Sequence, residues 1–173
     1  MAASDTHYAS GDSLSIPTYH VLVVDDSARD ALLLERLLQR SEEAAFEVTH
    51  VTSAQAGLEA IENSAYDLVL LDFYLPDLDG LGFLQTKQSR GLTTPVIMLT
   101  AFGQERLPVE AIQAGAFDYF RKDELQSALL GKAIQQAIER ARLQAEATTT
   151  AARVQELEAM VSQLQQQLEA QDT

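Results

Sequence analysis

The sequence has no cysteine and few basic residues. Without cysteine the chain cannot form a disulfide, a thiolate metal site or a cysteine nucleophile. Its 12 lysine and arginine residues stand against 26 aspartate and glutamate residues, which gives a formal net charge of −14. This deficit of positive charge argues against unaided binding to nucleic acid or to an anionic membrane surface, because both need clustered basic side chains.

Long hydrophobic runs are missing as well. No stretch approaches the ~20 apolar residues that a transmembrane helix needs, and the N-terminus lacks the basic flank and apolar core of a signal peptide. We therefore expect a cytoplasmic protein. The sequence also lacks a glycine-rich loop that ends in Lys-Ser or Lys-Thr, which argues against an ATPase.

The 173 residues, 46 % of them hydrophobic, suffice for one domain with a good core and an appendage. Residues 1–18 are small and polar, and we interpret them as a mobile arm. Residues 19–142 carry the regular apolar patterns of a folded domain. Residues 143–173 carry a narrower apolar pattern and form the appendage.

Apolar runs and helical patterns alternate five times in the folded domain. Between the runs, apolar residues recur at three- and four-residue steps, which is typical of helices. The alternation predicts an α/β fold with a parallel sheet, right-handed crossovers and helices on both faces. The second run alternates more than the others, so we place it at an edge of the sheet. The predicted strands are residues 19–24, 46–51, 67–72, 95–100 and 116–121.

The third strand carries the most information. Residues 68–71 are apolar without a break, and Asp72 follows them directly, ahead of a turn that contains Pro76 and Gly80. An unbroken apolar run bounded by turn residues predicts a strand buried on both faces. Asp72 is therefore expected at the carboxyl end of a central strand, where open α/β sheets place their ligands.

Four strand ends carry polar groups that would meet on one rim of a parallel sheet: Asp25, Asp26, Asp72, Thr100 and Lys122. Carboxylates about 5 Å apart repel by roughly 3 kcal/mol at an effective dielectric near 20, so the cluster needs a cation. Oxygen ligands of this kind suit Mg²⁺. The ion and Lys122 would neutralise an incoming phosphoryl group, and Asp72 could attack phosphorus as an aspartyl-phosphate nucleophile.

Residues 20–144 resemble the receiver domain of bacterial two-component response regulators, which is CheY-like. The matching motifs are VVDDS at 23–27, LDFYLPDLDG at 71–80, MLTA at 98–101 and GAFDYFRK at 115–122. The resemblance implies a flavodoxin-like, doubly wound sheet of five parallel strands in the order 2-1-3-4-5, with the last helix extended. It also implies that Asp72 accepts a phosphoryl group from a histidine kinase or phosphotransfer protein.

The resemblance implies further roles for single residues. Asp26 and Asp72 would bind Mg²⁺ together with the backbone carbonyl of Tyr74, and Asp25 would act mainly through metal-bound water. Thr100 and Lys122 would contact the phosphoryl oxygens, and Tyr119 would be the aromatic switch that turns inward when Thr100 moves. Such a protein is not an enzyme in the ordinary sense, although it assists its own phosphorylation and dephosphorylation.

Two positions depart from the family pattern. Asp123 stands where the family usually has a proline after the lysine, so we expect a trans peptide bond there. We also expect Asp123 to be the N-cap of the last helix, with Gln126 as its capping-box partner. Tyr74 is a bulky residue two positions past the acceptor, and it could shield an acyl phosphate from water.

The last helix is expected to continue beyond the domain, packing on the sheet through residues that include Leu129, Ala133 and Ile134. Further on, Val and Leu alternate at three- and four-residue steps, which is a coiled-coil seam with Val at a and Leu at d. This choice favours a parallel homodimer, in which Arg153 could pair with Glu158 of the other chain. Residues 148–150 are threonines, which are poor helix formers, so we expect the helix to be loose there. The seam residues are Val154, Leu157, Val161, Leu164 and Leu168.

Other interpretations remain open at this point. The appendage could be a single amphipathic helix folded back on its own domain. The protein could be a receiver-like dimerisation scaffold that is never phosphorylated, or the N-terminal part of a longer kinase or cyclase. A haloacid-dehalogenase-like phosphatase would also use an aspartate nucleophile, but it needs a second aspartate where Tyr74 stands.

Overall fold

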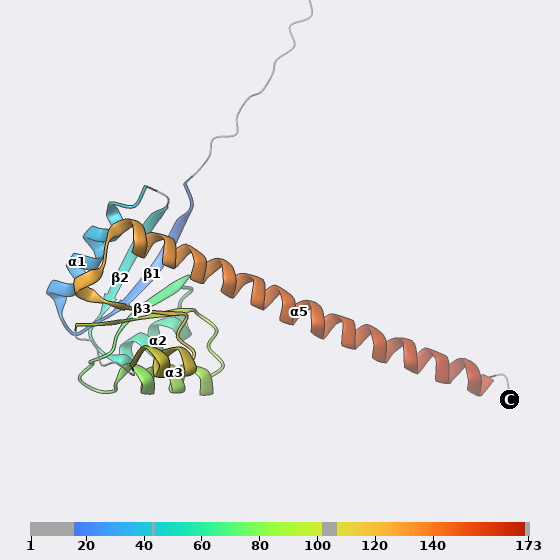
Figure 1. Cartoon of the computed structure of the whole chain (residues 1–173). Helices are drawn as coiled ribbons and strands as arrows, with labels where there is room; N and C mark the ends of the chain where they lie inside the picture. Colours follow the sequence, from blue (N-terminus) through green and yellow to red (C-terminus); the bar gives the residue numbers. More distant parts are fainter. Residues whose placement is uncertain (1–15, 43, 102–106, 172–173) are drawn as a thin grey trace, which may run out of the picture.

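The computed structural model describes residues 16–42, 44–101 and 107–171 (Figure 1). Five strands alternate with five helices and one short 3₁₀ turn in this part of the chain. The elements are β1 Thr18–Val24, α1 Ala28–Gln39, β2 Ala45–Val51, α2 Ala54–Asn63, β3 Leu68–Asp72, α3 Gly80–Ser89, β4 Val96–Thr100, α4 Leu107–Gln113, β5 Asp118–Arg121, η1 Lys122–Glu124 and α5 Ser127–Gln171.

The strands form one parallel sheet in the order β2-β1-β3-β4-β5. This order confirms the expected doubly wound topology, including the edge position of β2. The most central strands, β3 and β4, are buried along their whole length, as their unbroken apolar runs predicted. Residues 1–15 of the predicted mobile arm lie outside the described residues. The strand β1 begins at Thr18, the last residue that we assigned to the arm.

Successive residues of the central strands face opposite sides of the sheet, as a strand period of two requires. On one side, Leu22 and Leu71 pack with α2, α3 and α4. On the other side, Val23 and Leu70 pack with α1 and the first part of α5. Each side is therefore an apolar layer, and both layers hold the same strands in place.

Helix ends follow from local sequence. Ser27 is the N-cap of α1 and Ser53 that of α2, and each hydroxyl accepts a hydrogen bond from the backbone N–H three residues on. Gly115 has a positive φ of 99°, a conformation that glycine adopts readily, and it forms the turn after α4. Gly57 brings α2 close to β1, because a Cβ there would lie 2.8 Å from Val24 Cγ2.

The start of the last helix differs from expectation. No cis peptide bond occurs among the described residues, as we expected for the bond before Asp123. However, α5 begins at Ser127, and Asp123 lies in the η1 turn instead of capping the helix. The Asp123 carboxylate is bound by Arg121, with Nη2 to Oδ2 at 2.6 Å and Nε to Oδ1 at 3.1 Å. The ion pair with Arg121 thus replaces the predicted capping box.

The side of α5 that packs on the sheet differs from the predicted one in one residue. Leu129 is 47 % exposed, so its predicted packing is wrong, and Leu130 is fully buried in its place. Ala133 and Ile134 are buried as predicted, and Ala137 is buried with them. Two leucines stand side by side here, and they point about 100° apart around a helix, so only one can face the core.

Beyond residue 142, α5 extends away from the domain as one uninterrupted helix (Figure 1). The threonines at 148–150 do not break it, and each hydroxyl donates a hydrogen bond to the carbonyl four residues earlier. Arg153 pairs with Glu156 of the same helix at 2.6 Å. The predicted seam residue Leu168 lies where side chains are not described. Within the described residues, no helix combines the length and hydropathy that crossing a membrane requires.

Candidate functional site

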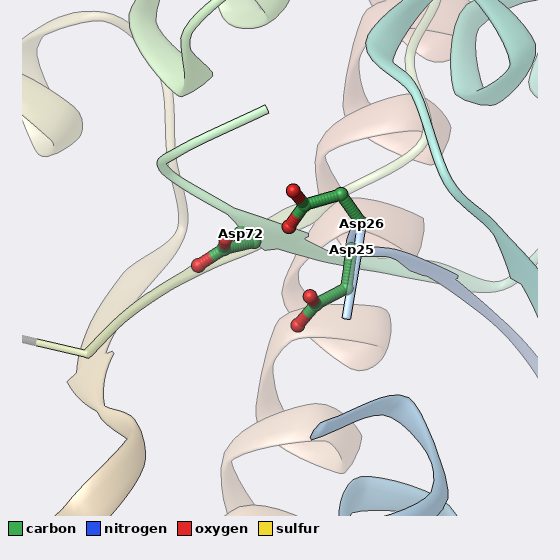
Figure 2. A group of neighbouring side chains, drawn as sticks. All are labelled: Asp25, Asp26 and Asp72. Carbon is green, nitrogen blue, oxygen red and sulfur yellow. The ribbon is translucent and has the colours of Figure 1, made fainter. Parts of the chain in front are cut away.

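The predicted rim residues meet at the carboxyl edge of the sheet. Asp25 directly follows β1, Asp72 ends β3, Thr100 ends β4 and Lys122 directly follows β5. Figure 2 shows the carboxylates of Asp25, Asp26 and Asp72 extending to the same side of the strand ends. One ligand oxygen from each of these three lies within 4.8 Å of the other two, which is close enough to share an ion.

Asp25 is held rigidly at the base of the site. Asp25 is 1 % exposed, and its Oδ1 accepts a hydrogen bond from the backbone N–H of Ser27 at 2.9 Å. The Asp25 backbone is also fixed to the edge strand β2. Its N–H donates to the carbonyl of Val51 at 3.0 Å, and its carbonyl accepts a hydrogen bond from His50 Nε2 at 2.7 Å.

Asp72 is the carboxylate with the most perturbed environment. It is 6 % exposed, and burial raises its pKa from 3.8 to about 6, although Lys122 opposes this increase. The negative charges of Asp25 and Asp26 raise the pKa further. Within the described residues, Asp72 Oδ1 is buried and has no hydrogen-bond partner. Lys122 Nζ lies 3.1 Å from it, as an ion pair without hydrogen-bond geometry.

These features fit a bound divalent cation. Three carboxylates converge on one ion-sized space, two of them are buried, and one buried oxygen lacks a hydrogen-bond partner within the described part of the chain. Hard oxygen ligands of this kind suit Mg²⁺, which binds through a few carboxylates and keeps several waters. The triad of Asp25, Asp26 and Asp72 is therefore typical of a Mg²⁺ site.

Lys122 supplies the positive charge of the site. Its side chain is 13 % exposed, and Nζ lies 2.7 Å from Asp25 Oδ2 and 3.0 Å from Asp30 Oδ2. Burial lowers the pKa of Lys122, but the hydrogen bonds and charges of Asp25, Asp72 and Asp30 outweigh burial and raise it. The lysine therefore keeps its positive charge beside the three carboxylates.

The sequence pattern did not indicate Asp30 as a site residue. It lies in the first turn of α1, four residues after Asp26. Asp26 precedes the N-cap Ser27, so helical spacing does not relate these two residues. The partner of Asp30 is Lys122, 92 positions further on, and no local signal in the sequence points to that contact.

The aromatic residues predicted for the site lie near it. Thr100 is fully buried at the end of β4, and the buried hydroxyl of Tyr119 is close enough to Thr100 for its pKa to be affected. Burial raises the pKa of Tyr119, and Thr100 opposes the increase. Tyr74 is 50 % exposed, and its ring packs edge-on against Phe73 with centroids 4.8 Å apart.

The sheet order and the acidic rim define a doubly wound α/β protein with a cluster of three aspartates at the carboxyl edge of its sheet. Comparison with known proteins agrees with this class. Residues 21–135 match the family described as the response regulator receiver domain. The chain belongs to this family of two-component receiver domains.

Two curated relatives illustrate the match. The chain is 34 % identical over 141 residues to the transcriptional regulatory protein FixJ of Bradyrhizobium diazoefficiens, covering 80 % of this chain and 67 % of FixJ. It is 39 % identical over 109 residues to the transcriptional activator protein PfeR of Pseudomonas aeruginosa, covering 63 % of this chain and 34 % of PfeR. The chain thus spans about a third of PfeR and about two thirds of FixJ.

Solved structures share the fold. A response regulator receiver domain protein from Clostridium thermocellum has a TM-score of 0.63 at 31 % identity, over 72 % of this chain and 98 % of that chain. A CheY-like receiver domain protein from Methanospirillum hungatei has a TM-score of 0.61 at 25 % identity, over 75 % of this chain and 99 % of that chain. These alignments leave about a quarter of the chain unmatched.

Proposed function

We propose that this chain is a phosphorylatable receiver and that Asp72 is its phosphoacceptor. A receiver domain implies a cognate histidine kinase, and we infer that such a kinase or a phosphotransfer protein is the donor. The observation that supports Asp72 most is its setting. It is buried beside two further carboxylates, and an ammonium group lies 3.1 Å from its oxygen.

The transfer exchanges one bond for another. An oxygen of the ionised Asp72 attacks the phosphorus of a phosphohistidine, an O–P bond forms and the N–P bond breaks. The imidazole leaves with the electron pair and takes up a proton. The product is an acyl phosphate on Asp72, which is later hydrolysed. Catalysis of this kind consists mainly of positioning and charge neutralisation.

The side chains present divide these tasks. Lys122 lies where its ammonium can pair with a phosphoryl oxygen, and Thr100, at the end of the neighbouring strand, can donate its hydroxyl to another. Asp25, Asp26, Asp72 and the backbone carbonyl of Tyr74 would hold Mg²⁺. When bound, Mg²⁺ supplies Lewis-acid neutralisation of charge on the transferring phosphoryl group.

Tyr119 is proposed as the conformational reporter of phosphorylation. Its hydroxyl is buried close to that of Thr100. A Thr100 side chain drawn toward a phosphoryl group would leave space that the phenol ring can follow. Movement of Tyr119 would then change the surface around β5, where a partner could detect it.

The extension at 143–173 is proposed to form a parallel coiled-coil homodimer. Six large apolar side chains of its described residues are about half exposed, and four of them repeat along one side of the helix, which is unusual for a helix without a partner. Their spacing corresponds to a narrow a/d seam, and a seam buries such side chains against a second copy. The four residues are Val154, Leu157, Val161 and Leu164.

Phosphorylation by a small-molecule donor tests the acceptor role. Incubation with acetyl phosphate and Mg²⁺ should add one phosphoryl group to the wild-type chain, detected by intact-mass spectrometry. Asp72→Asn should take up none, whereas Asp67→Asn, directly before the same strand, should behave as wild type. Uptake by Asp72→Asn would exclude Asp72 as the acceptor. No uptake by the wild type would favour an unphosphorylated dimerisation scaffold.

A further inference from the structure

Asp30 lies outside the acidic triad, yet it contacts the same lysine. It belongs to the first turn of α1, and its Oδ2 accepts a hydrogen bond from Lys122 Nζ at 3.0 Å. The two residues are 92 positions apart in the sequence, so this contact fastens the segment after β5 to α1. Asp30 is not among the carboxylates that could hold the metal ion together.

The lysine has three N–H donors and three carboxylates around it. Two of these carboxylates, Asp25 and Asp72, belong to the triad that would bind the divalent cation. A cation there shares their negative charge and weakens their attraction for the ammonium. Asp30 is the carboxylate around Lys122 that keeps its full charge for the lysine in that state.

The residues that follow Lys122 do not hold it. Asp123 and Glu124, although adjacent in sequence, pair with Arg121 at 2.6 Å and 3.0 Å. The ammonium is therefore fixed by three side chains from other parts of the chain: Asp25 after β1, Asp30 in α1 and Asp72 at the end of β3.

We propose that Asp30 is a positioning residue, which holds the Lys122 ammonium beside Asp72 while the acidic triad binds its cation. The inference rests on the proposed phosphoacceptor function. Asp30 touches neither the phosphoryl group nor the cation, and it acts only through Lys122. Its removal should therefore slow phosphoryl transfer without weakening cation binding.

The kinetic test compares Asp30→Ala and Asp30→Asn with Glu35→Gln. Glu35 is an acidic residue of the same helix whose carboxylate binds Gln39 instead of the site. With acetyl phosphate at saturating Mg²⁺, Asp30→Ala should react about fivefold more slowly, in the range that a partly exposed charge pair contributes. Asp30→Asn keeps a hydrogen-bond acceptor and should fall between Asp30→Ala and wild type. Glu35→Gln should match wild type, and the apparent Mg²⁺ affinity should stay within about twofold for all variants.

A double-mutant cycle shows whether the effect passes through the lysine. In a Lys122→Met background, Asp30→Ala should slow the reaction no further, because the group that it positions is gone. An equal loss with and without Lys122 would overturn the proposal. A wild-type rate for Asp30→Ala would overturn it as well.

A measurement at saturating Mg²⁺, without a phosphodonor, separates this inference from the proposed function. Side-chain NMR relaxation should give a lower order parameter for the Lys122 Cε methylene in Asp30→Ala than in wild type or Glu35→Gln. An unchanged order parameter would overturn the positioning role, even if phosphorylation is normal. A wild-type protein that takes no phosphoryl group would overturn the proposed function, while this NMR comparison would still decide whether Asp30 restrains Lys122.

Discussion

The carboxylate of Asp77, in the loop between β3 and α3, binds the backbone N–H of Ala54 at the start of α2, with Oδ1 at 2.9 Å. Its other oxygen accepts a hydrogen bond from the N–H of Gln55 at 2.8 Å. The first N–H groups of a helix have no partner within the helix and attract negative charge. The loop that follows the phosphoacceptor is thereby tied to a neighbouring helix.

Replacing Asp77 with Ala should lower the free energy of unfolding by about 1 kcal/mol, the usual cost of losing a side-chain helix cap. Partial desolvation raises the pKa of Asp77, but hydrogen bonds from Gln55 and Ala54 outweigh it and lower the pKa below 3.8. The stabilisation should therefore persist above pH 4 and be lost at lower pH, as Asp77 takes up its proton. Urea titrations of both proteins at pH 7 and pH 3 measure this.

The matched control for Asp77 is Glu139→Gln, which removes an exposed carboxylate of α5 that caps no helix. It should leave the free energy of unfolding within about 0.5 kcal/mol of wild type. A loss as large in Glu139→Gln as in Asp77→Ala would show that net charge, and not the cap, is responsible.

Asp72 should make stability depend on pH in the opposite sense. Its pKa is raised from 3.8 to about 6, so between these values the folded chain keeps a proton that the unfolded chain has lost. The free energy of unfolding should therefore fall as pH rises from about 4 to about 6, in the absence of divalent ions. Asp72→Asn lacks this ionisation and should be more stable than wild type by about 3 kcal/mol at pH 7.

The two proteins should converge in stability below about pH 4, where Asp72 is protonated in both the folded and the unfolded chain. Asp67→Asn, which changes a partly buried aspartate whose carboxylate accepts a hydrogen bond from the backbone N–H of His20, should keep the wild-type slope between pH 4 and pH 6. Saturating Mg²⁺ should stabilise wild type and leave Asp72→Asn nearly unchanged. A parallel pH profile for wild type and Asp72→Asn would contradict the raised pKa.

The sequence was sufficient for the sheet because its central strands are apolar on both faces. The unbroken run before Asp72 can satisfy its side chains only between two helical layers, and the structure places it there. Because the strands are parallel, their carboxyl ends all lie at the same edge of the sheet. The convergence of Asp25, Asp72 and Lys122 was therefore predictable before any side-chain geometry was known.

The contacts that cross between elements were not predictable in the same way. Asp30 and Asp77 each bind a group that belongs to a distant part of the chain, Lys122 and the α2 N-terminus. Periodicity says nothing about such pairs. The prediction that Asp123 caps the last helix was wrong for a related reason. The side chain of Arg121 binds the Asp123 carboxylate, and local capping rules do not consider such a competing side chain.

Tyr74 should affect how long the phosphorylated state lasts. It lies two residues after Asp72, half exposed, with its ring packed edge-on against Phe73. Tyr74→Ala should admit water to the acyl phosphate and accelerate its hydrolysis by about threefold or more. Decay of the phosphorylated protein after removal of the donor, followed by mass spectrometry, measures the lifetime. Tyr74→Phe keeps the ring and should decay as wild type, whereas an unchanged decay of Tyr74→Ala would eliminate the shielding role.

A charge placed inside the coiled-coil seam should weaken the dimer, whereas the same charge on the outer face of the helix should not. Leu157 is 46 % exposed and occupies a d position of the seam. Leu157→Glu would place two carboxylates against each other in the dimer, so we expect the dissociation constant to rise at least about 100-fold. Ala159→Glu adds the same charge at an outward f position and should leave the dimer intact. Sedimentation equilibrium of the full chain measures both.

Coupling between this seam and the acidic site can be tested in the same apparatus. Residues 127–138 of α5 pack on the sheet, and the same helix continues into the seam, so a shift of its first turns would be transmitted along a rigid rod. Beryllofluoride with Mg²⁺, which mimics the phosphoryl group, should then change the dimer dissociation constant of wild type by about threefold or more. It should change nothing in Asp72→Asn, which cannot bind the mimic. A ligand shifts an equilibrium only by its differential affinity for the two states. Equal dissociation constants for wild type with and without beryllofluoride would therefore show that phosphorylation of the domain and dimerisation of the helix are independent.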